Sequence, residues 1–269
     1  MATPKTSLHT RSISLPSTSH PLDATTENHF CRLRVAQAEP SSSSTLTRNL
    51  SNMKDLHEQM NDFILLPHNL QILSNEIIRT QVDEVLDGSV TLLDISSTTL
   101  DALSQTKESI LDLKSAFRRG SYNEGINTFA MSRKKIIKDL SKFLVKIKKV
   151  EQNYSPKVET NGSIISLLKE AETISIATLK SLVLFLMGSK ETKVRGWSLV
   201  NKLMKSKRLE NTTEVECLNQ AILDNVDSKV VMKHLETLEM VVLELEKELE
   251  FVSRCFVKTR VSLLNILNH

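Results

Sequence analysis

The segment VMKHLETLEMVVLELEKELEFVSRCF, residues 231–256, decides the fold. Its apolar residues recur in alternating steps of four and three, at Val231, Leu235, Leu238, Val242, Leu245, Leu249, Val252 and Phe256. Leu263 and Ile266 continue the series. This period places one apolar seam along a single long helix, and such a seam must be covered by other helices. Those helices belong either to the same chain, which short loops favour, or to a second copy in a coiled-coil homodimer through residues 230–267.

The composition extends the helical interpretation to the whole chain. Its 269 residues include only six glycines and six prolines, and aromatic residues make up 4%. Sandwiches and barrels need more turn-forming residues, whereas 40% apolar residues suffice for a sizeable core. We therefore predict an all-α protein, an elongated antiparallel helical bundle with long heptad-patterned helices and a disordered N-terminal tail.

Composition also divides the chain into two parts. Residues 1–45 are rich in Ser and Thr and have too little apolar surface to offset chain entropy, so we expect a disordered tail with a short helix at 29–38. The helical bundle domain is expected over residues 46–269. Within it, Gly120 and Gly188 are placed to end helices.

Two further patterns predict helices inside the bundle domain. Residues 82–119 contain no proline and carry two series of sevens, at Leu86, Leu93 and Leu100 and at Leu103, Ile110 and Phe117. They predict one helix of up to about 57 Å. Thr213 and Glu216 have the spacing of a capping box, which predicts the start of another helix.

Charge and cysteine content restrict the compartment and the partners. The net charge of +3 is too small to require nucleic acid or a membrane by itself. Cys31, Cys217 and Cys255 are far apart and predict neither a disulfide framework nor a zinc site. No run of about eighteen apolar residues predicts a spanning helix. We expect a cytoplasmic protein; peripheral membrane attachment stays open, as does plastid targeting through the acid-poor N-terminus.

No sequence pattern predicts a reaction. Nothing matches a phosphate-cradling glycine loop, a nucleophile elbow or an H-E-x-x-H metal helix, so we expect no catalytic residues, no cofactor and no metal site. A basic cluster surrounds Trp197, and basic residues with an aromatic side chain can bind nucleic acid. A single tryptophan among Leu and Val at helical spacing is more typical of a core anchor. We therefore expect no nucleic-acid partner.

The strongest local charge lies in SRKKIIKDLSKFLVKIKKV, residues 132–150. Five lysines fall on one side of the predicted helix, away from its apolar stripe: Lys135, Lys138, Lys142, Lys146 and Lys149. This lysine stripe can hold an anionic membrane surface, and a basic amphipathic helix also resembles a calmodulin target. The alternative is a solvated helix face. Glutamates of the last helix would partly neutralise the lysines if the two helices were neighbours.

The expected tail carries the pattern R-S-x-S-x-P, formed by Arg11, Ser12, Ser14 and Pro16. This pattern is read by 14-3-3 proteins once the second serine is phosphorylated, and an arginine three residues before that serine suits a basophilic kinase. The phosphate adds about −1.5 to −2 charge, which an arginine pocket can capture. Serine-rich tails also produce such matches by chance. With that alternative open, we predict a phosphorylatable tail.

Three phrases resemble a known family: SLHTRSISLPSTSHPL at 7–22, GWSLV at 196–200 leading into KLMKSKR, and RCFVKTRVSLLNILNH at 254–269. They are similar to the plant-specific domain-of-unknown-function family related to Bypass proteins. The resemblance implies a helical plant protein without known catalytic residues, with relatives linked to root and shoot development. The implied function is a noncatalytic regulatory or scaffold protein. A peripheral membrane-binding module that uses the lysine stripe is the alternative.

Overall fold

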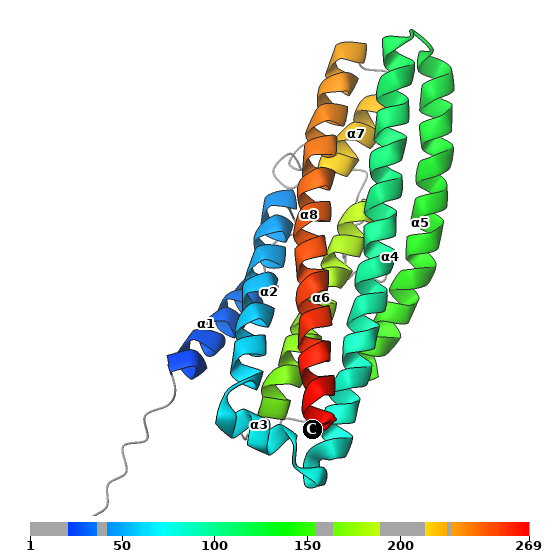
Figure 1. Ribbon diagram of the computed structural model, residues 1–269. Coiled ribbons are helices and arrows are strands. Elements are labelled where there is room, and N and C mark those ends of the chain that lie inside the picture. The colour runs from blue at the N-terminus through cyan, green and yellow to red at the C-terminus, as the bar shows by residue number, and fades with distance from the viewer. Residues whose placement is uncertain (1–20, 37–41, 154–163, 189–212, 225–226, 269) are drawn as a thin grey trace, which may run out of the picture.

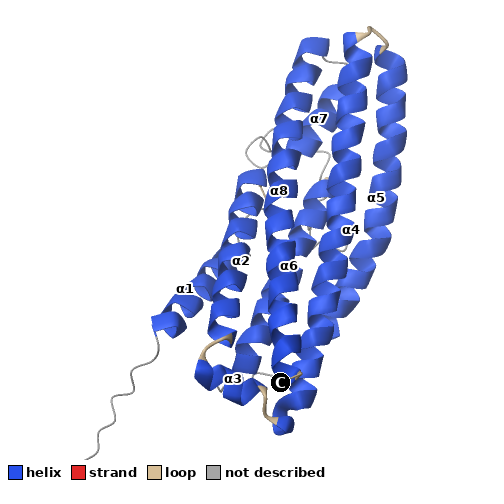
Figure 2. Cartoon of the chain, viewed as in Figure 1, coloured by secondary structure: helices blue, strands red, loops and turns tan. Residues whose placement is uncertain are grey.

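The protein is described by a computed structural model that covers residues 21–36, 42–153, 164–188, 213–224 and 227–268. Every regular element in these ranges is helical: α1 (Pro21–Ala36), α2 (Ser43–Ile64), α3 (Pro67–Leu73), the 3₁₀ helix η1 (Glu76–Ile78), α4 (Arg79–Arg118), α5 (Tyr122–Asn153), α6 (Ile164–Met187), α7 (Glu214–Leu223) and α8 (Ser228–Leu267). The long helices run side by side as an elongated bundle (Figure 1), with no strand in the described ranges (Figure 2). The predicted fold class is confirmed.

The seam of residues 231–256 is buried along its whole length. It lies on α8, which packs on α4 and α2 and, near its start, on α7. Leu235, Val242 and Leu249 are each 0% exposed. The seam is thus covered by helices of the same chain, which is the first of the two alternatives that the sequence left. A homodimer through this seam would require the bundle to open.

The predicted long helix is α4, which packs on α8, α5 and α6. One series of sevens, Leu103, Ile110 and Phe117, is buried, whereas Leu93 and Leu100 of the other series are only partly buried. Hydroxyl side chains occupy much of the remaining buried surface: Ser89, Ser96, Thr99, Thr106 and Ser109.

Four of these five buried hydroxyls donate to carbonyls of α4 itself, and the exception is Ser96, whose Oγ has no hydrogen-bond partner. Thr99 Oγ1 donates to the carbonyl of Ile95 at 2.7 Å, and Thr106 Oγ1 donates to the carbonyl of Ala102 at the same distance. A hydroxyl that bonds its own helix can enter a core without an unpaired donor. Small side chains also leave room for the three helices that surround α4. A heptad count that treats Ser and Thr as polar does not recognise these positions as buried.

The predicted helix ends are confirmed. Gly120 follows α4 with φ of 77°, and Gly188 follows α6 with φ of 68°, the left-handed conformation that glycine adopts without a Cβ penalty. At the start of α7, the Thr213 backbone N–H donates to Glu216 Oε2 at 3.1 Å. The Glu216 backbone N–H donates to Thr213 Oγ1 at 3.3 Å, which completes the capping box.

The N-terminal part differs from the sequence expectation. Where residues 1–45 were expected to be disordered except for a helix at 29–38, α1 already begins at Pro21 and α2 at Ser43. Phe30 and Leu33 explain the difference, because they are 0% and 1% exposed and pack α1 against α2 and α6. Their burial stabilises a helix whose own sequence has only a weak apolar stripe. Residues 1–20 lie outside the described ranges.

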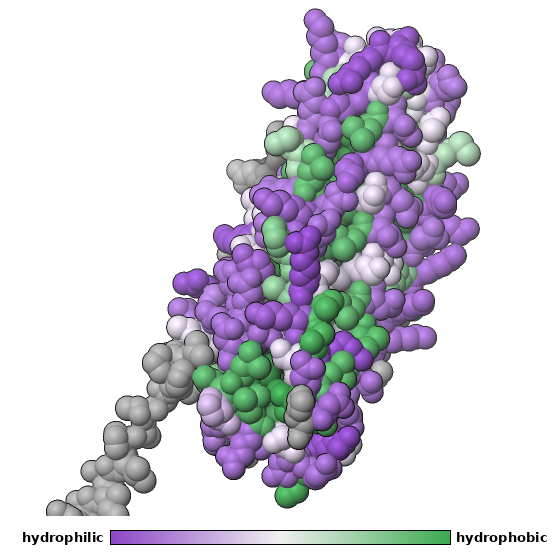
Figure 3. Space-filling view, viewed as in Figure 1, coloured by the Kyte–Doolittle hydropathy of each residue, from purple (hydrophilic) through white to green (hydrophobic). Residues whose placement is uncertain are grey.

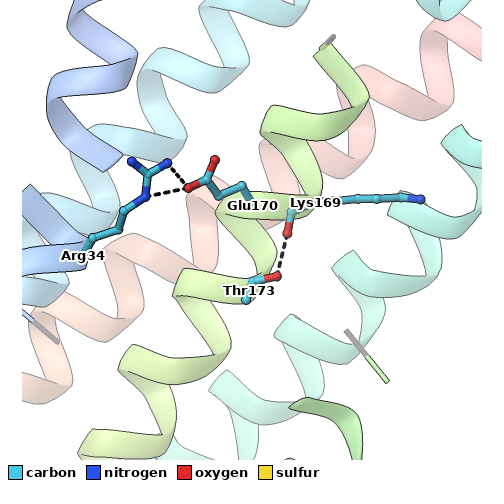
Figure 4. Close-up of polar contacts among 4 residues, drawn as sticks. All are labelled: Arg34, Lys169, Glu170 and Thr173. Atoms are coloured by element: carbon cyan, nitrogen blue, oxygen red, sulfur yellow. Dashed lines mark hydrogen bonds and ion pairs between the residues drawn. The ribbon is translucent and has the colours of Figure 1, made fainter. Parts of the chain in front are cut away.

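Two adjacent residues of α6 connect it to helices on opposite sides. Glu170 accepts a hydrogen bond from Arg34 Nε of α1 at 2.8 Å, and Lys169 Nζ donates to Glu84 Oε2 of α4 at 2.6 Å. Figure 4 shows the Lys169 and Glu170 side chains pointing in opposite directions. Ion pairs this exposed contribute little stability, about 0–1 kcal/mol each, but they favour one arrangement of the three helices.

Truncation of the seam tests its role. Leu249→Ala removes a fully buried side chain and should lower the free energy of unfolding by about 2–5 kcal/mol, because lost burial and a cavity both contribute. Met240→Ala on the same helix, at a position that is 69% exposed, should change it by less than about 0.5 kcal/mol. Urea unfolding followed by circular dichroism measures both. Equal effects would show that the seam is not the core.

Candidate functional site

The lysine stripe lies on the outer face of α5. The inner face of this helix buries Ile136, Leu140, Phe143 and Ile147 against α4 and α6. The five lysines of the stripe, Lys135, Lys138, Lys142, Lys146 and Lys149, are all exposed. The structure thus brings the predicted residues together on one solvent-facing surface. It makes the calmodulin-target interpretation less suitable, because such a target presents its apolar face to the partner.

The charge of the stripe is left largely uncompensated. Among the described residues, its one ion pair joins Lys142 to Asp139 at 3.9 Å, where both side chains are well exposed. The glutamates of α8 do not supply the neutralisation that was considered from the sequence, because α4 separates α8 from α5 (Figure 1). Two of them instead pair with lysines of α4, in the pairs Lys107–Glu246 and Lys114–Glu239.

Other side chains extend this surface. Lys134 and Lys148 flank the stripe and are exposed. Met131 and Val145, on the same side of α5, are 75% and 55% exposed. An array of ammonium groups with nearby apolar side chains binds anionic surfaces by summed charge rather than by fixed hydrogen-bond geometry. The surface is therefore suited to a broad anionic partner.

The phosphorylation motif and one segment considered but not predicted as a site lie outside the described ranges. These are the phosphorylation motif of Arg11, Ser12, Ser14 and Pro16, and the basic cluster around Trp197.

A buried polar contact joins α2 to α6. His57 Nε2 lies 2.8 Å from Ser175 Oγ, and Ser175 Oγ donates its proton to the carbonyl of Ala171 at 2.7 Å. Ser175 Oγ therefore accepts from His57, which assigns the proton to Nε2 and leaves Nδ1 as an acceptor without a hydrogen-bond partner. The imidazole and the Phe256 ring are nearly perpendicular, with a centroid distance of 4.6 Å and an interplanar angle of 79°.

Burial determines the charge state of this histidine. His57 is 4% exposed, and desolvation lowers its pKa from 6.5 to about 4. The imidazole is neutral at physiological pH. Histidine and serine are residue types that catalyse group transfer, but Ser175 is 0% exposed and His57 is nearly so, which leaves no room for a substrate at the hydroxyl. The contact therefore orients two helices, and we assign no reaction to it.

Glu172, one helical turn before Ser175, is a second buried ionisable group. It is 4% exposed, and neither carboxylate oxygen has a hydrogen-bond partner. Desolvation raises its pKa from 4.5 to about 8, although the charge of Lys169 opposes the shift. The side chain is therefore mostly protonated at neutral pH. Sequence analysis missed this residue because KEAET resembles an ordinary solvated helix segment.

Arg133 is the third buried ionisable side chain that sequence analysis missed. Its Nη2 donates to the carbonyl of Leu186 in the last turn of α6, and its Nη1 has no hydrogen-bond partner. Burial lowers its pKa to about 10, so it remains protonated at neutral pH. A cation at this position compensates the negative end of the α6 dipole and satisfies a terminal carbonyl.

Metal-binding clusters and membrane-spanning helices were also considered within the described ranges. They contain no group of three or more His, Cys, Asp or Glu side chains that are arranged to hold a metal ion. None of their helices combines the length and the apolar character needed to cross a membrane.

Comparison with known protein families finds a match over most of the chain. A family model described as Protein BPS1 matches residues 49–266, which is most of the chain and includes every described helix from α3 to α7. No curated protein and no solved structure matches the chain.

The pH dependence of unfolding tests the burial of Glu172. Its pKa is higher in the folded state, about 8, than the 4.5 of an unperturbed carboxyl group, so its favourable contribution is complete below pH 4.5 and is lost as the pH rises to about 8. Across this window, the free energy of unfolding of wild type should fall relative to that of Glu172→Gln, by an amount on the order of a few kcal/mol.

His57 has the opposite effect, because its contribution to the free energy of unfolding rises between about pH 4 and pH 6.5. This contribution is the same in wild type and variant, so it cancels when the two free energies of unfolding are subtracted. Chemical denaturation at several pH values gives the difference. Glu236→Gln, which changes an exposed carboxylate on α8, is the matched control and should show no such slope. A flat difference for Glu172→Gln would contradict the buried, protonated carboxyl.

Proposed function

We propose a function from one premise: the chain belongs to the BPS1 family. Membership indicates a plant developmental regulator. On this basis we propose that the protein is a noncatalytic regulatory or scaffold protein in root and shoot development signalling. We also propose that its N-terminal tail contains a phosphorylation site.

The observation that carries this proposal is the rigid bundle with exposed charged faces. Two helices, α4 and α8, each contain 40 residues, which corresponds to about 60 Å. Both bury one face along most of their length, so the outer faces of the bundle are held in fixed positions. A rigid rod with fixed charged faces is suited to holding partners rather than to enclosing a small substrate.

The position of the phosphorylation motif supports a role for the tail. Pro16 lies five residues before α1 begins at Pro21. Because α1 is fixed to the bundle by Phe30 and Leu33, a partner that captures phosphorylated Ser14 would be held close to the bundle. We propose a basophilic kinase and a 14-3-3 protein as the partners, with cytoplasmic localisation.

Capture by 14-3-3 tests the tail. After treatment with a basophilic kinase, wild type should bind immobilised 14-3-3, and Ser14→Ala should lose at least tenfold of that binding because the arginine pocket then has no phosphate. Ser19→Ala, which lies outside the motif, is the matched control and should retain binding. Equal capture of wild type and Ser14→Ala would end the proposal for the tail.

The exposed lysine stripe favours a second candidate function, that of a peripheral membrane-binding module. Each lysine near an anionic membrane surface contributes about 1 kcal/mol, so five on one face would suffice for weak, salt-dependent attachment. The exposed side chains of Met131 and Val145 could enter the headgroup region. Plastid targeting would be a separate property of the N-terminal residues.

Vesicle flotation tests the second candidate. Wild type should float with vesicles containing phosphatidylserine at low ionic strength, and the triple variant Lys138→Glu, Lys142→Glu, Lys146→Glu should not, because reversing three charges changes the net charge of this face by six units. The control reverses three exposed lysines of α8, Lys229, Lys233 and Lys247, and should float almost normally. Failure of wild type to bind would remove this candidate.

A further inference from the structure

The outer face of α4 carries a row of acids. Six exposed carboxylates follow one another in steps of four or seven residues: Asp83, Asp87, Asp94, Asp101, Glu108 and Asp112. These steps keep all six on one side of the helix. We call this row the acidic ladder. It runs along most of α4, away from the buried stripe.

The acidic ladder and the lysine stripe open on the same side of the bundle. The helices α4 and α5 are antiparallel neighbours joined at Gly120, with a groove of about 660 Å³ between them. Glu108 and Asp112 line one wall of the groove and Lys135 lines the other. The two helices approach closely at this end, since a Cβ on Gly125 would lie 2.4 Å from the Cβ of Ala116.

The two rows also match in height along the bundle. Counted from Gly120, Asp101 and Lys138 are 19 and 18 residues away, and Asp94 and Lys146 are both 26 residues away. At 1.5 Å per residue, Asp101 and Asp94 each lie level with a lysine on the neighbouring helix. Yet no ion pair joins the acidic ladder to the lysine stripe in the described ranges.

We propose that the chain forms a homodimer in which the α4–α5 faces of two copies lie against each other. A two-fold axis parallel to the long axis of the bundle exchanges the two sides and keeps every residue at its height. It therefore places α4 of one copy on α5 of the other, with Asp101 facing Lys138 and Asp94 facing Lys146. The same contacts form twice, as in any isologous interface.

The chemistry of this face favours a second copy over a lipid surface. An anionic membrane attracts the lysine stripe but repels the acidic ladder beside it, whereas a second copy uses both. Two exposed apolar side chains lie within the rows by their spacing, Val90 in the acidic ladder and Met131 in the lysine stripe, and they can add apolar contacts. The alternative seam on α8 is already covered within the chain.

The contact should be weak and sensitive to salt. Figure 3 shows hydrophilic side chains over most of the visible surface of the bundle, with hydrophobic ones in separate patches. Exposed ion pairs are individually weak, and salt screens them over about 10 Å at 0.1 M. A dimer held by such pairs forms at low ionic strength and dissociates as salt is added.

Sedimentation equilibrium of the full chain tests the proposal with a charge swap. The basic reversal is Lys138→Glu, Lys142→Glu, Lys146→Glu, and the acidic reversal is Asp87→Lys, Asp94→Lys, Asp101→Lys. Wild type should be dimeric at about 0.02 M salt, with a dissociation constant at least tenfold higher at about 0.5 M. Each reversal alone should be monomeric, since both helices then carry the same sign. An equimolar mixture of the two should again form dimers.

Controls separate this result from unfolding and from membrane binding. Circular dichroism checks that each variant is helical; if a triple variant does not fold, Lys142→Glu and Asp94→Lys should each raise the dissociation constant at least threefold. Reversal of Lys229, Lys233 and Lys247 on α8 should leave the dimer intact. The acidic reversal should not weaken vesicle binding. A monomeric wild type at low salt, or a mixture that stays monomeric, would overturn the proposal.

Discussion

The burial of the α8 seam is the interaction on which the rest of the structure depends. This helix spans the bundle and contacts α4 and α2 along its length, so its apolar face determines how those helices are rotated. Once α4 buries its wide stripe against α8, α6 and α5, only one side of it remains for solvent. The acids of α4 occupy that side, and the orientation of α5 follows from its packing on α4 and α6.

The distribution of charge follows from the same packing. The partly buried pairs Lys107–Glu246 and Lys114–Glu239 join α4 to α8, so glutamates of α8 are neutralised by lysines of α4. Because α4 lies between α8 and α5, the glutamates of α8 do not neutralise the lysine stripe. The surface properties of the protein therefore result from which helices are neighbours. They do not follow from its net charge of +3, which is small.

Three buried ionisable side chains show where pattern analysis reaches its limit. His57, Arg133 and Glu172 lie inside the bundle although their residue types favour solvent. A periodicity count assigns such residues to the outer face or ignores them. Each is buried because a second helix covers it, and that covering helix is distant in sequence, as with Ser175 for His57 and Leu186 for Arg133.

The sequence by itself determined the helical class, the main helix ends at Gly120 and Gly188, and the face of α5 on which the lysines lie. These depend on spacing within a few residues, which sets the side of a helix and its local hydrogen bonds. Only the tertiary structure decided that the seam is covered within the chain, that Phe30 and Leu33 hold α1 in place, and that acids of α4 lie beside the lysines of α5. Those outcomes depend on contacts between residues far apart in the chain, about which local periodicity carries no information.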